Sequence, residues 1–215
     1  MKLNGFIVGL FILSSITLNA QDWSTGKYKY GEQYEGYVVD INGDRIDGFI
    51  KYRNRAIMQD EVIFYGDKDN ASTKKKYAVS DLAEFKVADK HYHCIPYSGS
   101  NGVQLIKANL VVSDEGCIKT YVWYYRASGY KSMKKRAGES DEDYGNRKFP
   151  SVKVYFKSTD GMGVTKDFFS DDFKKKMASY TSDNKELSKK VKKGENGYSE
   201  RNFMAILKEF NESCN

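Results

Sequence analysis

The stretch GYVVDINGDRIDGFIKY, residues 36–52, decides the fold class of this chain. Two segments of alternating apolar and polar residues flank Asn42-Gly43. A type I′ turn needs positive φ at both central residues, and Asn followed by Gly adopts that conformation at the lowest cost. The stretch therefore predicts a β-hairpin with a two-residue loop. This register pairs Val39 with Ile46 and places Tyr37, Val39, Ile46 and Ile50 on the core face.

Further strands are expected downstream, because β-branched and aromatic residues alternate between short turn sequences. The long helices that a parallel sheet requires are missing before Ser170. The chain is therefore expected to be an α+β protein, mainly an antiparallel β meander folded as a sandwich or open barrel, with a C-terminal helical segment. The β domain is assigned to residues 36–170, with strands at 62–65, 76–79, 84–87, 91–95, 104–112, 117–125, 152–157 and 164–168.

The hydrophobic period changes from strand-like to helical after Ser170. Ser170 is predicted to cap a first helix, and Asp183 with Glu186 forms a capping-box-like start for a second. Gly194 ends that helix, and a third begins near Ser199. The tail, 171–215, is expected to pack on the sheet through its apolar stripes: Phe173, Met177, Tyr180, Leu187, Val191, Phe203, Ile206, Leu207 and Phe210.

Residues 1–20 have the pattern of a secretory signal peptide. Lys2 gives a positive start, residues 6–18 are almost entirely apolar, and Ala20 completes a small-residue cleavage site. The apolar run is too short to span a bilayer comfortably, and no later run approaches that length. We therefore expect export to the periplasm or the extracellular space, with a polar N-terminal arm at 21–35 and no transmembrane span after cleavage.

Two charged regions interrupt this pattern. Residues 127–150 are charged, contain glycine and lack large aliphatic side chains, so they are expected to form a mobile insert, although loops of this length are otherwise often functional.

The chain carries a net charge of +6, and residues 171–193 contain eight lysines against four acids. This lysine-rich stretch could attract an anionic envelope surface or an acidic polysaccharide. A solvated helix face is the plainer interpretation, and nucleic acid is not expected, because an exported protein rarely meets it.

Three cysteines allow three alternative single disulfides. Cys94 and Cys117 both fall in predicted strands, so a bridge between them is plausible if those strands are neighbours. Buried free thiols are the alternative, because cysteine is among the residue types most often buried. Cys214 lies almost at the end of the sequence and is expected to be exposed or free.

The chain contains two histidines, His91 and His93, separated by one residue in a predicted strand. Residues two apart on a strand point to the same face, so both imidazoles could hold one metal ion, while Cys94 points the other way. Two ordinary strand histidines are the plainer interpretation of this pattern. A third ligand would have to come from elsewhere, for instance from Asp81, Glu84 or Asp89.

Most common catalytic patterns are missing from the sequence. A serine or cysteine nucleophile that needs an imidazole base would have to use His91 or His93. There is no Gly-x-Ser-x-Gly elbow, Walker phosphate loop or dinucleotide-binding glycine pattern, and no cofactor is expected. Two carboxylates could still form a glycosidase pair, but the sequence does not single out which two.

The aromatic residues Tyr121, Trp123 and Tyr125 alternate along one predicted strand. They are expected to line one face of the sheet, with Tyr124 on the other. An exposed aromatic ladder could stack sugar rings or anchor a partner protein. A buried ladder would simply belong to the core, which is the more common role of aromatic residues in sheets.

Several of these features together resemble a group of uncharacterised exported proteins of Bacteroidetes. The resemblance is carried by the Ala20-Gln21 junction, the Gly36–Ile50 hairpin sequence, the Tyr-x-Val-Ser-Asp-Leu segment at 77–82 and the lysine-rich tail. It implies export and a β-rich fold, but no mechanism. The sequence thus favours a secreted or periplasmic, non-catalytic binding module that contacts an anionic surface, a polysaccharide or another envelope protein. The alternative is a hydrolase or metal-dependent enzyme centred on His91 and His93.

Overall fold

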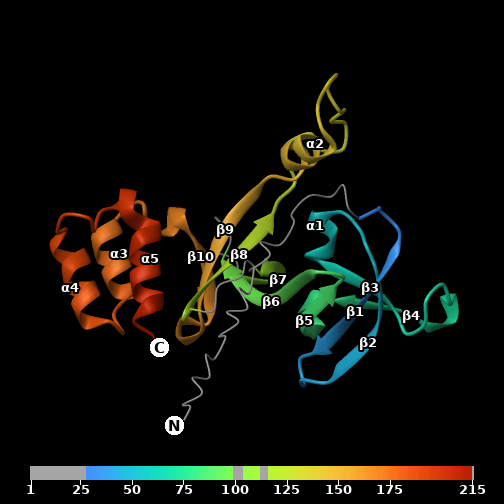
Figure 1. The fold of residues 1–215 in the computed structure, drawn as a ribbon, viewed down its shortest axis with the longest axis horizontal. Helices are drawn as coiled ribbons and strands as arrows, with labels where there is room; N and C mark the ends of the chain where they lie inside the picture. Colours follow the sequence, from blue (N-terminus) through green and yellow to red (C-terminus); the bar gives the residue numbers. More distant parts are fainter. Residues whose placement is uncertain (1–27, 99–103, 112–115, 215) are drawn as a thin grey trace, which may run out of the picture.

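The computed structural model describes residues 28–98, 104–111 and 116–214, so the predicted signal peptide lies outside the described residues. Its centre is a ten-stranded, mostly antiparallel sheet of order β10-β9-β8-β7-β6-β5-β1-β2-β3-β4 (Figure 1). The sheet is open and is followed by helices, which confirms the predicted α+β class with a β meander. The strands are β1 Gln33–Asp40, β2 Arg45–Lys51, β3 Glu61–Tyr65, β4 Lys74–Ala78, β5 Leu82–Val87, β6 Lys90–Ser98, β7 Gln104–Val111, β8 Ile118–Tyr124, β9 Ser151–Lys157 and β10 Met162–Thr165.

Most strands pair with their neighbours in sequence, as a meander requires. The departure is β5, which returns to pair with β1, so that β1–β5 form one group and β6–β10 another. In the second group the sheet curls until β10 meets β6 through one parallel bridge, Gly163 to Tyr97. The strand predicted at 164–168 is correspondingly short, because residues 166–169 form a 3₁₀ turn. The 3₁₀ turns are η1 Ala71–Thr73, η2 Val79–Asp81, η3 Ser158–Asp160, η4 Lys166–Phe169 and η5 Glu200–Asn202.

The predicted hairpin exists as β1 and β2, but its predicted register is wrong by one residue. The backbone N–H of Asp40 donates to the carbonyl of Asp44 at 3.1 Å, which leaves a three-residue loop ending at Gly43 with φ +91°. The Asp40 carboxylate accepts from the backbone N–H groups of Asn42, in the loop, and Asp44, directly after it, and this favours the longer turn. Since a shift of one residue exchanges the faces of β1, Val38 now pairs with Ile46 and shares the core face with Ile50. Val38 and Ile50 are fully buried, and Ile46, beside the turn, is 42% exposed. Tyr37 and Val39 therefore lie on the face opposite Val38.

Two glycines face each other across this hairpin because other atoms occupy the space of their side chains. A Cβ on Gly36 would lie 1.9 Å from the carbonyl oxygen of Lys86, and one on Gly48 would lie 2.5 Å from the Phe64 ring. Both positions therefore require glycine for the close approach of neighbouring strands.

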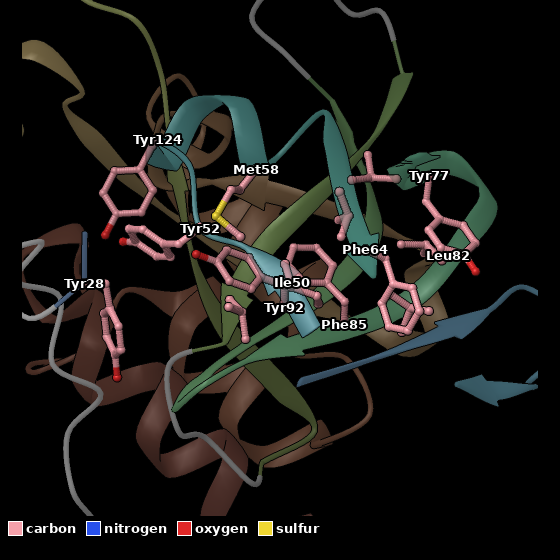
Figure 2. Close-up of a cluster of buried hydrophobic side chains, with 14 of the residues drawn as sticks. Tyr28, Ile50, Tyr52, Met58, Phe64, Tyr77, Leu82, Phe85, Tyr92 and Tyr124 are labelled. Atoms are coloured by element: carbon pink, nitrogen blue, oxygen red, sulfur yellow. The ribbon is translucent and has the colours of Figure 1, made fainter. Parts of the chain in front are cut away.

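A tyrosine-rich core covers one face of the N-terminal strands (Figure 2). Phe85 and Tyr92 stack at 4.5 Å between ring centroids, and helix α1, Arg55–Met58, adds the buried Met58. Tyr28 is also buried here, and β1 begins at Gln33, so the expected polar arm at 21–35 is structured from residue 28 onward; residues 21–27 lie outside the described residues. This core comprises Tyr28, Val38, Ile50, Tyr52, Met58, Val62, Phe64, Tyr77, Val79, Leu82, Phe85, Val87, Tyr92, Val122 and Tyr124.

A second core lies between the C-terminal helices and β8–β10, at the opposite end of the molecule (Figure 1). The helices are α3 Phe173–Tyr180, α4 Lys185–Lys193 and α5 Phe203–Glu212. Their N-caps are Asp172 for α3 and Asn184 for α4, rather than the predicted Ser170 and Asp183. The predicted packing of the tail on the sheet is confirmed, because its apolar stripes meet Ile118, Tyr155 and Val164.

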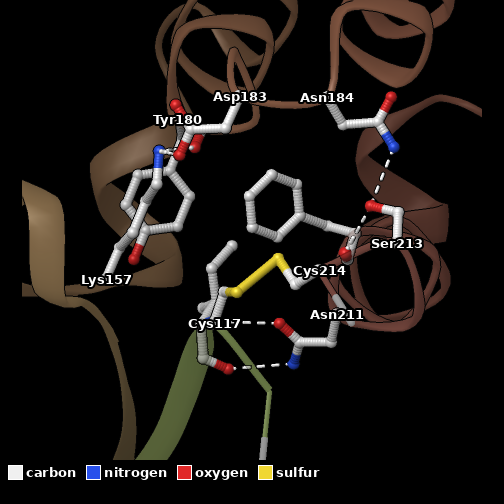
Figure 3. The surroundings of a disulfide bond; sticks show 10 residues. Cys117, Lys157, Tyr180, Asp183, Asn184, Asn211, Ser213 and Cys214 are labelled. Carbon is white, nitrogen blue, oxygen red and sulfur yellow. Dashed lines mark hydrogen bonds and ion pairs between the residues drawn. A yellow bond between two sulfur atoms is a disulfide. The ribbon is translucent and has the colours of Figure 1, made fainter.

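A disulfide fastens this helical end to the sheet, and it is not the predicted one. Cys117, just before β8, is bonded to Cys214, just after α5 (Figure 3). Cys94 is free and half-buried. The prediction of a Cys94–Cys117 bridge and a free Cys214 is wrong because Cys94 points to the tyrosine-rich core. Beside the disulfide, the Asn211 amide donates to the carbonyl of Ile118 and accepts from its N–H, each at 2.9 Å.

The insert at 127–150 contains helix α2, Asp141–Lys148, within an arm that projects from β8 and β9 (Figure 1). The Ser140 hydroxyl caps this helix by accepting from the backbone N–H of Asp143 at 3.0 Å. Arg147 donates to both carboxylate oxygens of Glu139, at 2.8 and 2.7 Å. The expectation that this insert lacks structure is corrected accordingly, because it contains a capped helix and its charged residues pair with one another; its mobility stays a prediction. Across the described part of the chain, no helix combines the length and apolar character that crossing a membrane requires.

Candidate functional site

The two predicted histidines lie side by side on the sheet face opposite the tyrosine-rich core. Strand β6 places Tyr92 and Cys94 on the core side, and His91 and His93 on the other side. The two imidazole rings meet edge to face, with centroids 4.6 Å apart. The alternation of side chains along a strand explains this arrangement, as the sequence predicted.

The neighbouring strand β5 supplies a carboxylate to the same place, because Glu84 pairs directly with His93 across the two strands. The Glu84 Oε2 atom lies 3.3 Å from His91 Nε2 and 3.5 Å from His93 Nε2. The candidate ligand atoms of all three side chains lie within 4.8 Å of one another. Glu84 was one of three carboxylates that the sequence offered as a third ligand. Neither Asp81 nor Asp89 belongs to this cluster of described residues.

Two tyrosines border this cluster. The Tyr121 hydroxyl lies 2.8 Å from His93 Nδ1, and the Tyr37 hydroxyl lies 3.5 Å from His91 Nε2. Burial, together with the nearby His91, lowers the pKa of His93 to about 4, so His93 is neutral at pH 7. Burial and the Glu84 carboxylate raise the pKa of both tyrosines, so their hydroxyl groups keep their protons.

The predicted aromatic ladder continues from the histidine cluster along β8. Tyr121, Trp123 and Tyr125 share one face and Tyr124 lies on the other, as the strand period predicted. Tyr121 is only 1% exposed, whereas Tyr125 is 40% exposed. Trp123 is half-buried and contacts the Tyr97 ring, with centroids 4.9 Å apart. The ladder is therefore mostly packed in the curl of β6–β10, and only its outer end faces solvent.

The lysine-rich helices α3 and α4 present a charged surface on the far side of the second core. Lys190 donates to Tyr198 and Glu209, and Lys176 pairs with Asp171. The remaining lysines of this surface are exposed: Lys174, Lys175, Lys185, Lys189, Lys192 and Lys193. A solvated helix face, which was the plainer interpretation, describes this arrangement well.

A pocket of about 650 Å³ lies between the segment 28–30, the start of α1 and the insert. Sequence reasoning did not find it, because its walls come from three segments far apart in the chain. The sequence feature that could have indicated this pocket is the group of tyrosines and cations at 28–30 and 127–150. The pocket is lined by Tyr28, Lys29, Tyr30, Tyr52, Arg53, Asn54, Arg55, Tyr130, Lys131, Tyr144, Gly145, Lys148 and Phe149.

This pocket combines aromatic rings with positive charge, and its described lining contains no Asp or Glu. Arg55 is 5% exposed, lies over the Tyr124 ring and donates to Asn146 Oδ1 at 2.8 Å. Arg53 is paired with Glu61 behind the pocket. At the rim, Lys131 and Lys29 are exposed.

The insert wall of the pocket is fixed by its own hydrogen bonds. The Tyr144 hydroxyl donates to the carbonyl of Met133 at 2.8 Å and accepts from Lys148 Nζ at 3.1 Å. The Tyr130 and Phe149 rings lie 6.0 Å apart at their centroids. These contacts hold three rings and a cation in fixed positions, which is the property of a preformed site.

Comparisons with protein-family models, with curated proteins and with solved structures each found no match. The candidate sites therefore depend on geometry alone: the pocket beside the insert and the Glu84–His91–His93 cluster on the sheet.

Proposed function

We propose that this protein is an exported, non-catalytic binding module that holds an anionic, ring-bearing ligand, such as an acidic polysaccharide. The observation that carries this proposal is the pocket beside the insert, whose described lining residues include six aromatic rings and five cationic side chains but no carboxylate. Within an overall charge of +6, this local excess selects for anionic ligands.

The two kinds of side chain serve different parts of such a ligand. Aromatic faces pack against the apolar faces of sugar rings, whereas the lysines of the pocket contact carboxylate or sulfate groups. Hydrogen bonds to charged groups each contribute about 1.5–3 kcal/mol when geometry is favourable. A ligand that spans the pocket therefore gains affinity from its shape and specificity from its charge.

The proposed export has two independent supports. The sequence of residues 1–20 follows the charge, apolar run and small-residue order of a signal peptide. The Cys117–Cys214 disulfide is of the kind that persists in an oxidising compartment and is rare in the cytosol.

A hydrolase that uses His91 or His93 as its base is less well supported. Both imidazoles contact Glu84, Tyr37 or Tyr121, and within the described residues neither has a hydrogen bond to a serine, threonine or cysteine. A nucleophile positioned for activation by an imidazole is what such a mechanism requires.

The test is calorimetric titration of the purified protein with an oligogalacturonate and with a neutral oligosaccharide of equal length. The acidic probe is expected to bind, and its affinity should fall as added salt shortens the range of the charge interaction. A Lys131→Ser/Lys148→Ser double variant should lose about tenfold or more in affinity, since it removes two cationic groups of the pocket.

Two matched controls locate the binding surface. Lys189→Ser/Lys192→Ser removes two lysines from α4, and Trp123→Ala/Tyr125→Ala removes the outer end of the aromatic ladder. Both should bind the acidic probe as the unchanged protein does. Equal binding of both probes, or loss of binding only in one of these controls, would contradict the pocket as the binding site.

A further inference from the structure

We propose that Glu84, His91 and His93 form a binding site for a divalent transition metal such as Zn²⁺. The site lies on the sheet face opposite the tyrosine-rich core and shares no residue with the pocket beside the insert. It is therefore independent of the proposed function.

The spacing of the three side chains fits tetrahedral coordination. Zinc bonds to imidazole nitrogen and carboxylate oxygen are about 2.0–2.2 Å long, so the ligand atoms of a tetrahedral site lie about 3.3–3.5 Å apart. The Glu84 Oε2 atom lies 3.3 Å from His91 Nε2 and 3.5 Å from His93 Nε2. The spacing of these side chains thus matches two edges of the coordination tetrahedron.

The sheet also fixes how these ligands point. Glu84 and His93 are direct partners in the β5–β6 register, so the backbone hydrogen bonds of two paired strands hold them opposite each other. The Tyr121 hydroxyl lies 2.8 Å from His93 Nδ1, and Tyr121 itself is 1% exposed. A buried group that holds the second ring nitrogen orients an imidazole so that Nε2 faces the metal, which makes Tyr121 a positioning residue.

The donor set and its exposure leave room for a further ligand. Two imidazoles and one carboxylate are three protein ligands, and an open tetrahedral site takes a water or a ligand group in the fourth position. The three side chains are between 22% and 30% exposed, so the site is accessible from solvent. The nearby cations include Lys119, Arg45 and Lys86, the direct cross-strand partner of His91, and Arg45 is paired with Asp47.

The alternative for this cluster is a metal-free hydrogen-bond network. In that network, Tyr121 donates to His93 Nδ1 and the histidine Nε2–H groups donate to Glu84. In the metal site, His93 Nδ1–H donates to Tyr121 instead, and Nε2 is left to bind the ion. The two arrangements differ in the tautomer of His93, which imidazole ¹⁵N chemical shifts report.

The test is titration of the chelator-treated protein with ZnCl₂, followed by calorimetry and by imidazole ¹⁵N spectra. One Zn²⁺ per chain should bind, with shifts at both histidines, which are the only two in the sequence. Glu84→Gln and His93→Gln should each weaken binding at least about tenfold, while far-UV spectra check that both variants remain folded. Tyr121→Phe should weaken zinc binding by about 10–100-fold, the usual effect of losing an outer-shell partner.

Two variants serve as controls. Glu35→Gln removes an exposed carboxylate of the adjacent strand β1, and Cys94→Ser removes the free thiol on the other face; both should bind zinc unchanged. The proposal is overturned if zinc produces no saturable binding or no ¹⁵N shift at either histidine. It is equally overturned if Cys94→Ser abolishes binding while Glu84→Gln does not.

Discussion

The two ends of the sheet are completed in different ways. At the C-terminal end, three helices cover the strands, and the Cys117–Cys214 bond together with Asn211 fastens the last helix to β8. At the other end, the tyrosine-rich core borders α1 and the insert, and a pocket of about 650 Å³ stays open between them. The comparison teaches that one end of the sheet is closed by packed helices, whereas the other presents rings and charges to solvent, which is where the proposed function places binding.

Of the variants that test this comparison, removal of the disulfide should change the free energy of unfolding most. The bond joins residues 97 positions apart. In the chain-entropy model, a crosslink closing a loop of about 100 residues stabilises a fold by about 4.7 kcal/mol, chiefly by restricting the unfolded chain. Cys117→Ser/Cys214→Ser should lower the free energy of unfolding by about that amount in urea titrations. Cys94→Ser is the control and should change it by less than about 1 kcal/mol; equal losses from both variants would contradict the assigned bridge.

Asn211→Ala should have the next largest effect. The variant leaves the N–H and the carbonyl of Ile118 without their side-chain partner, and unpaired buried polar groups cost about 1–3 kcal/mol. Urea denaturation should therefore show a loss of about 2 kcal/mol. The exposed Ser199 also bonds to an asparagine, so Ser199→Ala provides a comparison that should cost little. A neutral Asn211→Ala would mean that the helical end does not depend on this contact.

At the pocket end, urea denaturation of single variants should show almost no loss in the free energy of unfolding. Tyr130→Ala and Lys131→Ser alter a half-buried ring and an exposed cation at the rim, and surface changes of this kind usually cost less than about 0.5 kcal/mol. Both should weaken binding of the oligogalacturonate while leaving the free energy of unfolding nearly unchanged. If they destabilise the fold as strongly as Asn211→Ala does, the pocket wall is a structural element and the division between the two ends fails.

The smallest expected effect is the loss of the Glu139–Arg147 contact of the insert at acidic pH. Arg147 lowers the pKa of Glu139 to about 2 from its usual 4.5. Because the folded-state pKa is depressed, this contact stabilises the insert above pH 4.5, and the stabilisation disappears as the pH falls from 4.5 toward 2. A carboxyl ¹³C titration should show this pKa directly, and Arg147→Lys should raise it, because lysine does not form the two-pronged contact. An ordinary pKa for Glu139 in the unchanged protein would indicate the mobile insert that its composition suggested.

The strand pattern was predictable because it depends on local alternation of side chains. The same alternation placed His91 with His93 and Tyr121 with Trp123 on shared faces. The predicted register of the β1–β2 hairpin was wrong because a single side chain changes the turn. The Asp40 carboxylate favours a three-residue turn over the two-residue turn that Asn42-Gly43 suggested. That choice moved Val38, not Val39, into the core.

Other features could not be predicted because they depend on contacts between distant parts of the chain. Cys117 meets Cys214 only because α5 returns to the start of β8. Glu84 became the third member of the histidine cluster through the β5–β6 register, which the sequence left open among three acids. The pocket needs the insert, α1 and Tyr28 together, so no single segment of the sequence contains its pattern.

The most direct test of the central claim is a chemical-shift map of the ¹⁵N-labelled protein titrated with the oligogalacturonate. Amide shifts concentrated at residues 28–30, 52–55 and 130–149, with α3–α5 unaffected, are the predicted result. Shifts confined to the lysines of α3 and α4, or no saturable shift at any position, would contradict a binding site at the open end of the sheet.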